Sequence, residues 1–198
     1  FTDETASEST APGGGSVAAA MGALGAALGT MVANLSSHKP GWDDRWEDFS
    51  EWAEKGQELK DRLMKLVDED TQAFRRIMAA FALPKTTDEE KKIRSAAIQE
   101  ATRYATLVPF RTMEAAYASL ELIKAMAEIG NPNSVYDAGV GALCARSAVL
   151  GAWLNVRTNT KGLDDKAFTS DILKRGNEMA LKVQEKESEI LRIVSEKL

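Results

Sequence analysis

No residue between Glu8 and His38 carries a charged side chain. Within this stretch the large apolar residues recur with gaps of 4, 3, 4, 3 and 4, which is the period of an α-helix and not the alternation of a β-strand. They are Val17, Met21, Leu24, Leu28, Met31 and Leu35. Nearly every residue between them is Ala or Gly, and such small side chains let neighbouring helices approach on several sides. The pattern predicts a central, fully buried helix.

A membrane span is the alternative for the same stretch, because the run is long enough and contains Gly25-x-x-x-Gly29. Ala and Gly gain little from transfer into lipid, and no apolar anchor flanks the run. The rest of the chain is strongly polar. We therefore favour a buried helix and expect no association with a membrane.

Composition favours one folded domain over residues 1–198, since 44% of the residues are hydrophobic and 28% are charged. A net charge of -5 argues against nucleic acid as a partner. One cysteine and one histidine exclude an internal disulfide and a His/Cys zinc site, so we expect no metal. A cytoplasmic location is the default expectation. The chain starts at Phe1 and not at Met, which leaves room for a longer parent polypeptide.

The remaining pattern predicts further long helices and no strands. A capping box at Thr87 and Glu90 starts one helix, which we expect to bend at Pro109. The expected spans run from Trp42 to about Ala82, from Thr87 to a turn at 130–133, from that turn to about Thr160, and from 163–165 to near Leu198. The predicted fold class is therefore all-α, a bundle of about five long helices around the buried Ala/Gly-rich helix.

A glycine-rich motif, Pro12-Gly13-Gly14-Gly15-Ser16, precedes the charge-free helix. Glycines allow the backbone to approach a ligand closely, and the first turn of a helix offers unpaired N–H groups and the positive end of its dipole. Such a site suits an anion or the polar edge of a heterocycle. A flexible linker has the same composition, but this motif occurs once and adjoins a strongly patterned segment.

Asp70 falls on the predicted inward face of the second long helix. The other members of that face are Leu63, Leu66, Phe74, Ile77 and Phe81. Burial raises the pKa of a carboxyl group unless a cation or hydrogen-bond donors stabilise its charge. Asp70 is therefore either an acid or base of an active site or one half of a structural ion pair with Arg or Lys, and the spacing does not decide between them.

The fourth long helix has a face of small residues with polar residues at both ends. Its members are Asp137, Gly141, Cys144, Ala148, Gly151, Asn155 and Asn159. Asp137 lies near the start of that helix, where a carboxylate stabilises the helix dipole without any catalytic role. Asp137 and Asn155 are separated by about 27 Å along one helix. Both belong to one site only if the ligand is long or if two subunits meet there.

These motifs, in this order, resemble the formiminotetrahydrofolate cyclodeaminase / methenyltetrahydrofolate cyclohydrolase family over nearly the whole chain. The matching segments are Pro12-Gly13-Gly14-Gly15-Ser16, Met31-Val32-Ala33-Asn34, Asp70-x-x-x-Phe74, Val108-Pro109, Gly130-Asn131 with Asp137, and Asn155-Val156-x-x-Asn159-x-Lys161. The resemblance implies a lyase of histidine degradation that closes 5-formiminotetrahydrofolate to 5,10-methenyltetrahydrofolate and releases ammonia. It further implies a homodimer or higher oligomer with folate near the subunit interface, and no cofactor beyond tetrahydrofolate itself.

The resemblance also implies roles for individual residues. Asp137 and Asp70 are the expected catalytic carboxylates. In the mechanism that we favour, Asp137 is the base and Asp70 is the acid that protonates the departing nitrogen, and the sequence does not decide which carboxylate takes which role. The expected substrate-binding residues are Gly13, Gly14, Gly15, Ser16, Asn131, Asn155, Asn159 and Lys161. Either Lys161 or Lys39 would meet a glutamate carboxylate.

Two other functions stay open from the sequence. Methenyltetrahydrofolate cyclohydrolase adds water to the same carbon, and the same carboxylates would serve it. A non-catalytic helical assembly module would use the glycine motif and the small-residue helix for packing alone.

Overall fold

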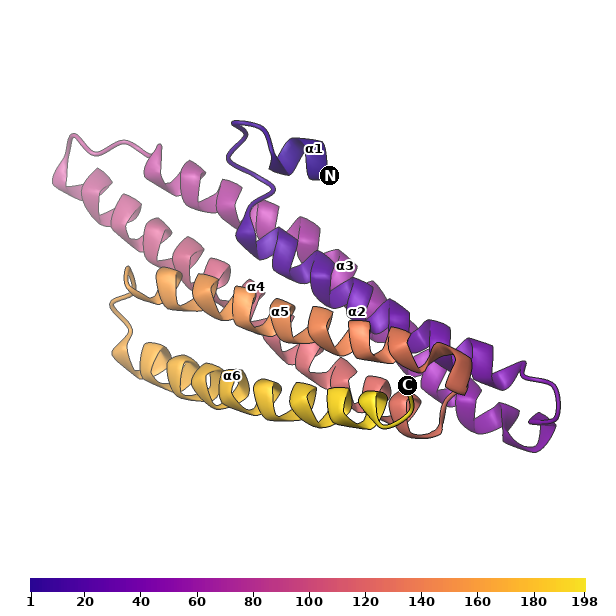
Figure 1. Cartoon of the computed structure of the whole chain (residues 1–198). Helices are drawn as coiled ribbons and strands as arrows, with labels where there is room; N and C mark the ends of the chain where they lie inside the picture. Colours follow the sequence, from indigo (N-terminus) through magenta and orange to yellow (C-terminus); the bar gives the residue numbers. More distant parts are fainter.

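The computed structural model describes residues 1–198, and all of its regular structure is helical. A short α1 (Thr2–Thr5) precedes five long helices that form an elongated bundle (Figure 1). The long helices are α2 (Gly14–Ser37), α3 (Trp46–Phe81), α4 (Asp88–Ile129), α5 (Val135–Thr160) and α6 (Lys166–Ser195). Short helical turns, η1 (Asp43–Arg45) and η2 (Pro132–Ser134), precede α3 and α5. The predicted all-α bundle of five long helices is confirmed.

Helix α2 occupies the middle of the bundle and packs against α3, α4 and α5, while α6 packs on α5 and α4. In Figure 1, α2 lies beside both α3 and α5. α2 and α5 run antiparallel. At one end Gly14 lies beside Asn155, and at the other the backbone N–H of Asn131 donates to the Ser36 hydroxyl at 2.8 Å. The two ends of α5 are therefore level with the two ends of α2.

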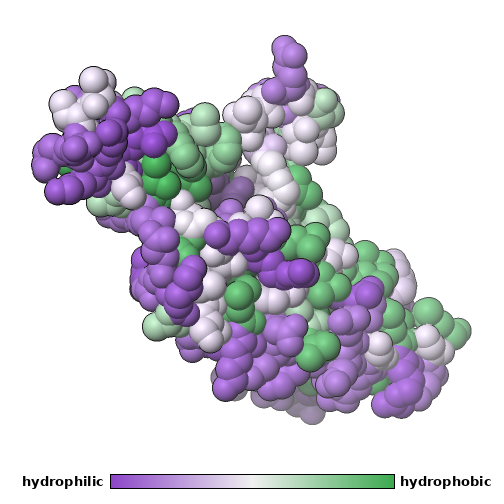
Figure 2. Space-filling model, turned by 90° about the vertical axis from the view of Figure 1, so that its left-hand side faces the viewer, coloured by the Kyte–Doolittle hydropathy of each residue, from purple (hydrophilic) through white to green (hydrophobic).

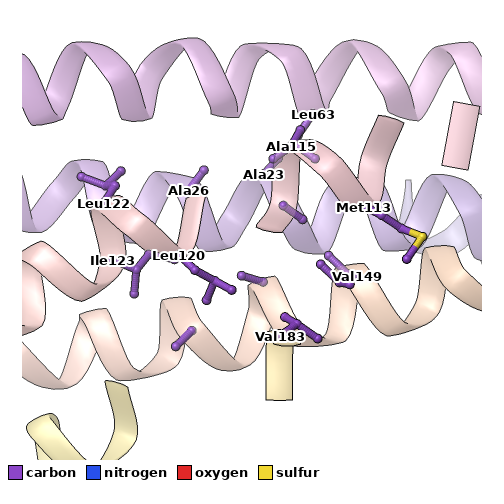
Figure 3. Packing of buried hydrophobic residues seen from close by; sticks show 14 of the residues in the cluster. Ala23, Ala26, Leu63, Met113, Ala115, Leu120, Leu122, Ile123, Val149 and Val183 are labelled. Carbon is purple, nitrogen blue, oxygen red and sulfur yellow. The ribbon is translucent and has the colours of Figure 1, made fainter. Parts of the chain in front are cut away.

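The prediction that α2 is fully buried through its large apolar residues is wrong. Leu24, Met31 and Leu35 are 58%, 38% and 46% exposed, and the other members of that face are half-buried. The buried faces of α2 consist mostly of small residues instead. They include Ala18, Ala19, Gly22, Ala23, Gly25, Ala26, Gly29 and Ala33. The core around α2 is filled by larger side chains from its neighbours (Figure 3), so the periodicity located a helix but not its inner face.

Small residues are required on α2 because the neighbouring helices come very close. A Cβ at Gly25 would lie 2.8 Å from the Gly141 carbonyl oxygen on α5, and a Cβ at Gly141 would lie 3.1 Å from the Gly25 carbonyl oxygen. Both obstacles are backbone atoms, which cannot move independently of their helices. Figure 3 shows the same principle toward α3, where Leu63 reaches in beside Ala23.

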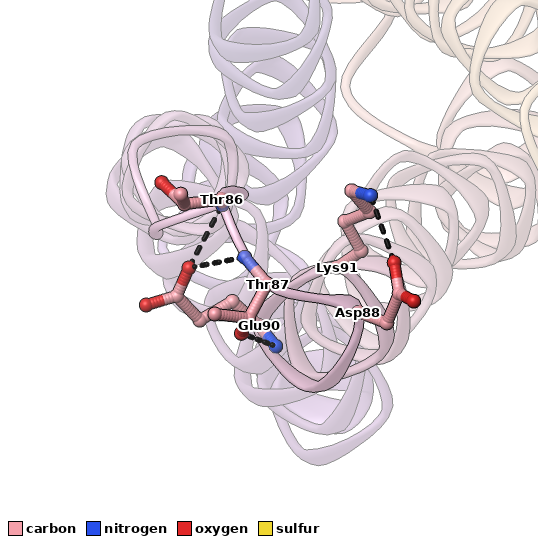
Figure 4. Close-up of polar contacts among 5 residues, drawn as sticks. All are labelled: Thr86, Thr87, Asp88, Glu90 and Lys91. Atoms are coloured by element: carbon pink, nitrogen blue, oxygen red, sulfur yellow. Dashed lines mark hydrogen bonds and ion pairs between the residues drawn. The ribbon is translucent and has the colours of Figure 1, made fainter.

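Helices α3 and α4 form a hairpin whose tip extends past the ends of α5 and α6 (Figure 1). Phe81, predicted to face inward, is 50% exposed because it lies at this tip. The predicted capping box at the start of α4 is confirmed: Glu90 N–H donates to the Thr87 hydroxyl at 3.2 Å, and Thr87 N–H donates to the Glu90 carboxylate at 2.9 Å (Figure 4). Helix α4 continues through Pro109 without a break.

Two segments, α2 and Pro132–Thr160, are long and apolar enough to cross a membrane by length and composition alone. Both pack against other helices of the bundle, and a core helix passes the same test. We therefore draw nothing about membranes from their composition.

Candidate active site

A cavity of about 190 Å³ opens where the first turn of α2 meets α3, α4 and α5. We call it the glycine-lined pocket. Its polar lining includes Gly13, Gly14, Gly15, Asp70, Asn155 and Asn159, and Phe74 and Ile77 of α3 supply an apolar wall. Figure 2 shows this end of the molecule, with a hollow between the α3–α4 tip at upper left and the N-terminal segment at upper right. The structure thus unites five of the predicted binding residues with one of the two predicted catalytic carboxylates.

Asp70 caps the start of α2 from a different helix. Its Oδ2 accepts a hydrogen bond from the Ser16 hydroxyl at 2.9 Å, and its carboxyl group also accepts from the Ser16 backbone N–H. The residue at the N-cap position of α2 is Gly13, which has no side chain to do this. A carboxylate beside a helix N-terminus is stabilised by the helix dipole as well as by these donors.

Asp70 can come this close to α2 because Gly15 has no side chain. A Cβ on Gly15 would overlap Asp70 Oδ1 and would lie 2.6 Å from its Cγ. A Cβ on Gly14 would meet only the Asn155 amide at 3.7 Å, which is an ordinary contact, and a Cβ on Gly13 would meet nothing within 4 Å. Of the three glycines, only Gly15 has a steric reason to lack a side chain.

Burial raises the pKa of the Asp70 carboxyl above its ordinary value of 3.8, and the hydrogen bonds from the Ser16 hydroxyl and backbone lower this pKa by less. The structural ion pair that the sequence left open is not formed, because Ser16 takes the place of an Arg or Lys partner. The pocket therefore holds a carboxyl group whose pKa is raised by burial, a property that is common among the acids and bases of active sites.

Ser16 supports Asp70 and does not line the pocket. It is fully buried, and its hydroxyl also lies 3.4 Å from the Thr71 hydroxyl. Ser16 therefore holds Asp70 in place, and its predicted contact with the substrate stays a prediction.

The side-chain amides of the two asparagines of α5 are each anchored through the nitrogen. Asn155 Nδ2 donates to the Gly151 carbonyl at 3.0 Å, and Asn159 Nδ2 donates to the Ala105 carbonyl of α4 at 2.7 Å. Neither amide oxygen accepts a hydrogen bond within the chain, and both residues line the pocket. The pocket thus offers two free amide oxygens and a carboxyl group.

The other predicted site residues lie elsewhere in the chain. Asp137 sits half-buried in the first turn of α5, about 27 Å along the helix from Asn155, and makes no hydrogen bond or ion pair within the chain. The Asn131 side chain accepts from the Asn133 N–H at 3.1 Å and so caps η2. Lys161 is exposed just beyond α5, and Lys39 Nζ lies 4.1 Å from the centre of the Trp42 ring.

The N-terminal segment also contributes to the pocket, through Thr10 and Ala11. Sequence reasoning missed both, because no spacing or composition signal marks an irregular segment that is placed only by folding.

Comparison with known proteins identifies the family. Residues 1–178 match the family described as "Formiminotransferase-cyclodeaminase". The chain is 43% identical over 174 residues to a methenyltetrahydrofolate cyclohydrolase of Methylorubrum extorquens, covering 88% of this chain and 84% of that protein. It is 36% identical over 168 residues to formimidoyltransferase-cyclodeaminase of Rattus norvegicus, covering 85% of this chain but 31% of that longer protein. The crystal structure of formiminotetrahydrofolate cyclodeaminase from Thermotoga maritima has a TM-score of 0.86 at 26% identity, covering 98% of this chain and 93% of that one.

The chain belongs to the formiminotransferase-cyclodeaminase family. The resemblance drawn from the sequence motifs is confirmed. Membership supports a folate-related activity of the cyclodeaminase or cyclohydrolase kind. The glycine-lined pocket is the candidate site for that activity in this family member.

Replacing Gly15 by Ala is expected to destabilise the fold by about 2 kcal/mol, because the new methyl group displaces the carboxylate that caps α2. Gly13→Ala is the matched control, since its methyl group enters open space, and it should change stability by less than about 0.5 kcal/mol. Thermal unfolding of both variants measures the difference. Equal stability of the two variants would show that Asp70 does not depend on Gly15.

Asp70 should make stability depend on pH in a defined direction. Its pKa is raised in the folded state, so the stability that its protonated form contributes is fully present below pH 3.8 and is lost as pH rises through the raised pKa. Asp70→Asn cannot ionise and escapes this loss, while its amide oxygen still accepts from Ser16. The melting temperature of Asp70→Asn minus that of the wild type should therefore increase between about pH 4 and pH 8. Asp68→Asn, on the exposed side of α3, is the control; a difference for Asp70→Asn that is flat or falls with pH would contradict the assignment.

Proposed function

We propose that this chain is a methenyltetrahydrofolate cyclohydrolase, which adds water to 5,10-methenyltetrahydrofolate and gives 10-formyltetrahydrofolate. This reverses the order of preference that the sequence suggested. The similarity to the Methylorubrum extorquens protein supports the change, because it extends over most of both chains.

The observation that carries the proposal is the charge character of the glycine-lined pocket. Its lining contains the Asp70 carboxyl group and two amide oxygens without partners, but no Lys or Arg. Asp70 already occupies the N-terminus of α2, so the positive end of that helix is not free for an anion. The pocket therefore suits a cation, and the methenyl group of the substrate is a cation delocalised over two nitrogens and the carbon between them.

Asp70 acts as the base and then as the acid in this mechanism. The bound cation favours the ionised carboxylate, which takes a proton from a water molecule as the water oxygen bonds to the methenyl carbon. The resulting tetrahedral centre carries a hydroxyl group. As the bond from that carbon to N5 breaks, Asp70 returns its proton to N5 and the hydroxyl proton passes to solvent, leaving a formyl group on N10.

The amide oxygens and the backbone orient the pterin. The N–H groups of Gly14 and Gly15 belong to the first turn of α2 and have no helical acceptor, so they suit a ring carbonyl. The oxygens of Asn155 and Asn159 suit ring N–H and amino groups. Phe74 and Ile77 cover the flat face of the ring, which holds the carbon in place for attack.

Formiminotetrahydrofolate cyclodeaminase activity is the second candidate, favoured by the likeness to the Thermotoga maritima structure. In that reaction N10 attacks the formimino carbon, ammonia leaves, and the same methenyl cation is the product. A pocket that stabilises this cation serves both reactions, which is why the residues do not separate them.

The purified chain should accelerate the loss of 5,10-methenyltetrahydrofolate over the spontaneous rate, and Asp70→Asn should lower that acceleration by about 10²-fold or more. Absorbance of the methenyl group follows the reaction directly. A parallel assay supplies 5-formiminotetrahydrofolate and measures ammonia. Turnover of the formimino substrate alone would establish the cyclodeaminase. If neither substrate is turned over and no folate binds, the chain is a non-catalytic helical assembly module.

We further propose that two copies pair through the outer apolar face, which consists of Leu24, Met31 and Leu35 of α2 with Tyr136, Val140 and Leu143 of α5. This face is exposed in one chain although its side chains are large and apolar, as expected of an interface. A two-fold axis that crosses the middle of α2 and reverses its direction brings the Asp137 end of one subunit to the glycine-lined pocket of the other. Asp137 thereby stays a candidate for stabilising the cation.

Mixing two variants tests this shared site, which predicts that Asp70→Asn and Asp137→Asn are each inactive when assayed separately. Dimers that contain one Asp70→Asn and one Asp137→Asn subunit would have one site with both substitutions and one with neither. Random exchange should therefore restore roughly a quarter of the wild-type activity. Full activity of Asp137→Asn alone, or a monomer by analytical ultracentrifugation, would rule out the shared site and leave Asp70 as the only carboxylate.

The remaining expectations stay predictions. They are a cytoplasmic location, no partner among nucleic acids or membranes, and no cofactor beyond the folate.

A further inference from the structure

Pro109 lies inside α4 and is buried. Proline has no backbone N–H, so the carbonyl four residues earlier, that of Ala105, loses its helical donor. The proline ring also crowds that carbonyl and tilts it away from the helix axis. Ala105 is itself only 6% exposed, so water does not readily replace the missing donor. A buried carbonyl without a donor is costly, and the fold must supply one.

Asn159 supplies it from α5. Its Nδ2 donates to the Ala105 carbonyl at 2.7 Å, across 54 residues of sequence. The nitrogen and oxygen of an amide lie on opposite arms of a planar group, so holding the nitrogen on α4 directs the oxygen elsewhere. Ala105 and Asn159 both line the glycine-lined pocket, and the Asn159 oxygen has no partner within the chain.

We propose that Pro109 is a positioning residue of the glycine-lined pocket: it frees the Ala105 carbonyl, which anchors the Asn159 amide by its nitrogen and presents the amide oxygen to the ligand as an acceptor. The ligand class that this arrangement selects is a ring bearing an N–H or amino donor at that edge. The identity of the ligand in this inference rests on the proposed folate activity. The link between Pro109, Ala105 and Asn159 does not depend on that activity.

A purely structural role is the alternative. In that case Asn159 only donates a hydrogen bond to the Ala105 carbonyl, and the oxygen of its amide has no function. The two roles differ in one respect: a structural unit affects stability alone, whereas a positioning unit makes the effect of Pro109 on substrate binding depend on Asn159.

The first experiment is a double-mutant cycle on thermal unfolding. Asn159→Ala in the natural background leaves the Ala105 carbonyl without a donor and should lower the melting temperature by roughly 5 °C. With Pro109→Ala also present, the new backbone N–H of residue 109 bonds to that carbonyl, so the same Asn159→Ala change should cost less than half as much. An equal cost in both backgrounds would overturn the proposed unit, and this measurement needs no substrate.

The second experiment is the same cycle on KM and kcat with 5,10-methenyltetrahydrofolate. Asn159→Ala should raise KM about fivefold, the loss of one hydrogen bond, with a smaller change in kcat. Pro109→Ala alone should raise KM about threefold by loosening the amide, and should add nothing in the Asn159→Ala background. If Pro109→Ala leaves KM unchanged, or raises it equally in both backgrounds, Pro109 does not act through Asn159.

Asn155 provides a matched control in the same pocket. Its amide nitrogen donates to the Gly151 carbonyl of its own helix, and this hydrogen bond does not involve the carbonyl that Pro109 frees. The effects of Asn155→Ala and Pro109→Ala on KM should therefore multiply, as independent changes do. Coupling as strong as that with Asn159 would show a general disturbance of α4 and overturn the proposal. If no folate is turned over by the natural chain, the proposed function fails while the unfolding cycle still decides the unit.

Discussion

The close approach of α2 to its neighbours is the constraint on which the rest of the structure depends. Gly25 and Gly141 bring the backbones of α2 and α5 into direct contact, and a methyl group at either position would meet a carbonyl oxygen. Three helices can surround α2 at this distance because the residues on its inner faces are mostly Gly and Ala. Three large apolar residues of α2, Leu24, Met31 and Leu35, are consequently turned outward, where one chain leaves them exposed.

The same closeness creates the pocket. Because α2 lies tight against α3, its first turn comes within hydrogen-bonding distance of Asp70, and Gly15 leaves room for the carboxyl group. Asp70 therefore has two roles that do not conflict. It caps a helix that cannot cap itself, and it presents to the cavity a carboxyl group whose pKa is raised by burial. The helix cap is observed and the catalytic role is proposed, and one side chain can serve both.

Under the proposed function, the pocket also suits both reactions that the names of the relatives describe. In the two reactions proposed for this chain, the methenyl cation is the substrate of the cyclohydrolase and the product of the cyclodeaminase. A cavity that holds a carboxyl group, two unpaired amide oxygens and no cationic side chain suits that species in either direction. The placement of Asp137 at the far end of α5 means that any part it takes in the chemistry requires a second subunit.

Much of this protein was determined by its sequence alone. Helical periodicity predicted the long helices, local hydrogen-bonding chemistry predicted the cap at Thr87, and the spacing on α3 placed Asp70 among inward residues. These features depend on residues a few positions apart, which the chain brings together in any helix. Tertiary structure alone decided which face of α2 is buried. It also decided that Ser16 donates to Asp70 and that Asn159 donates to the Ala105 carbonyl, which Pro109 frees. The reason is physical: a period reveals that a helix has faces, but the packing of distant helices selects the inner one, and here close backbone contact outweighed the burial of large side chains.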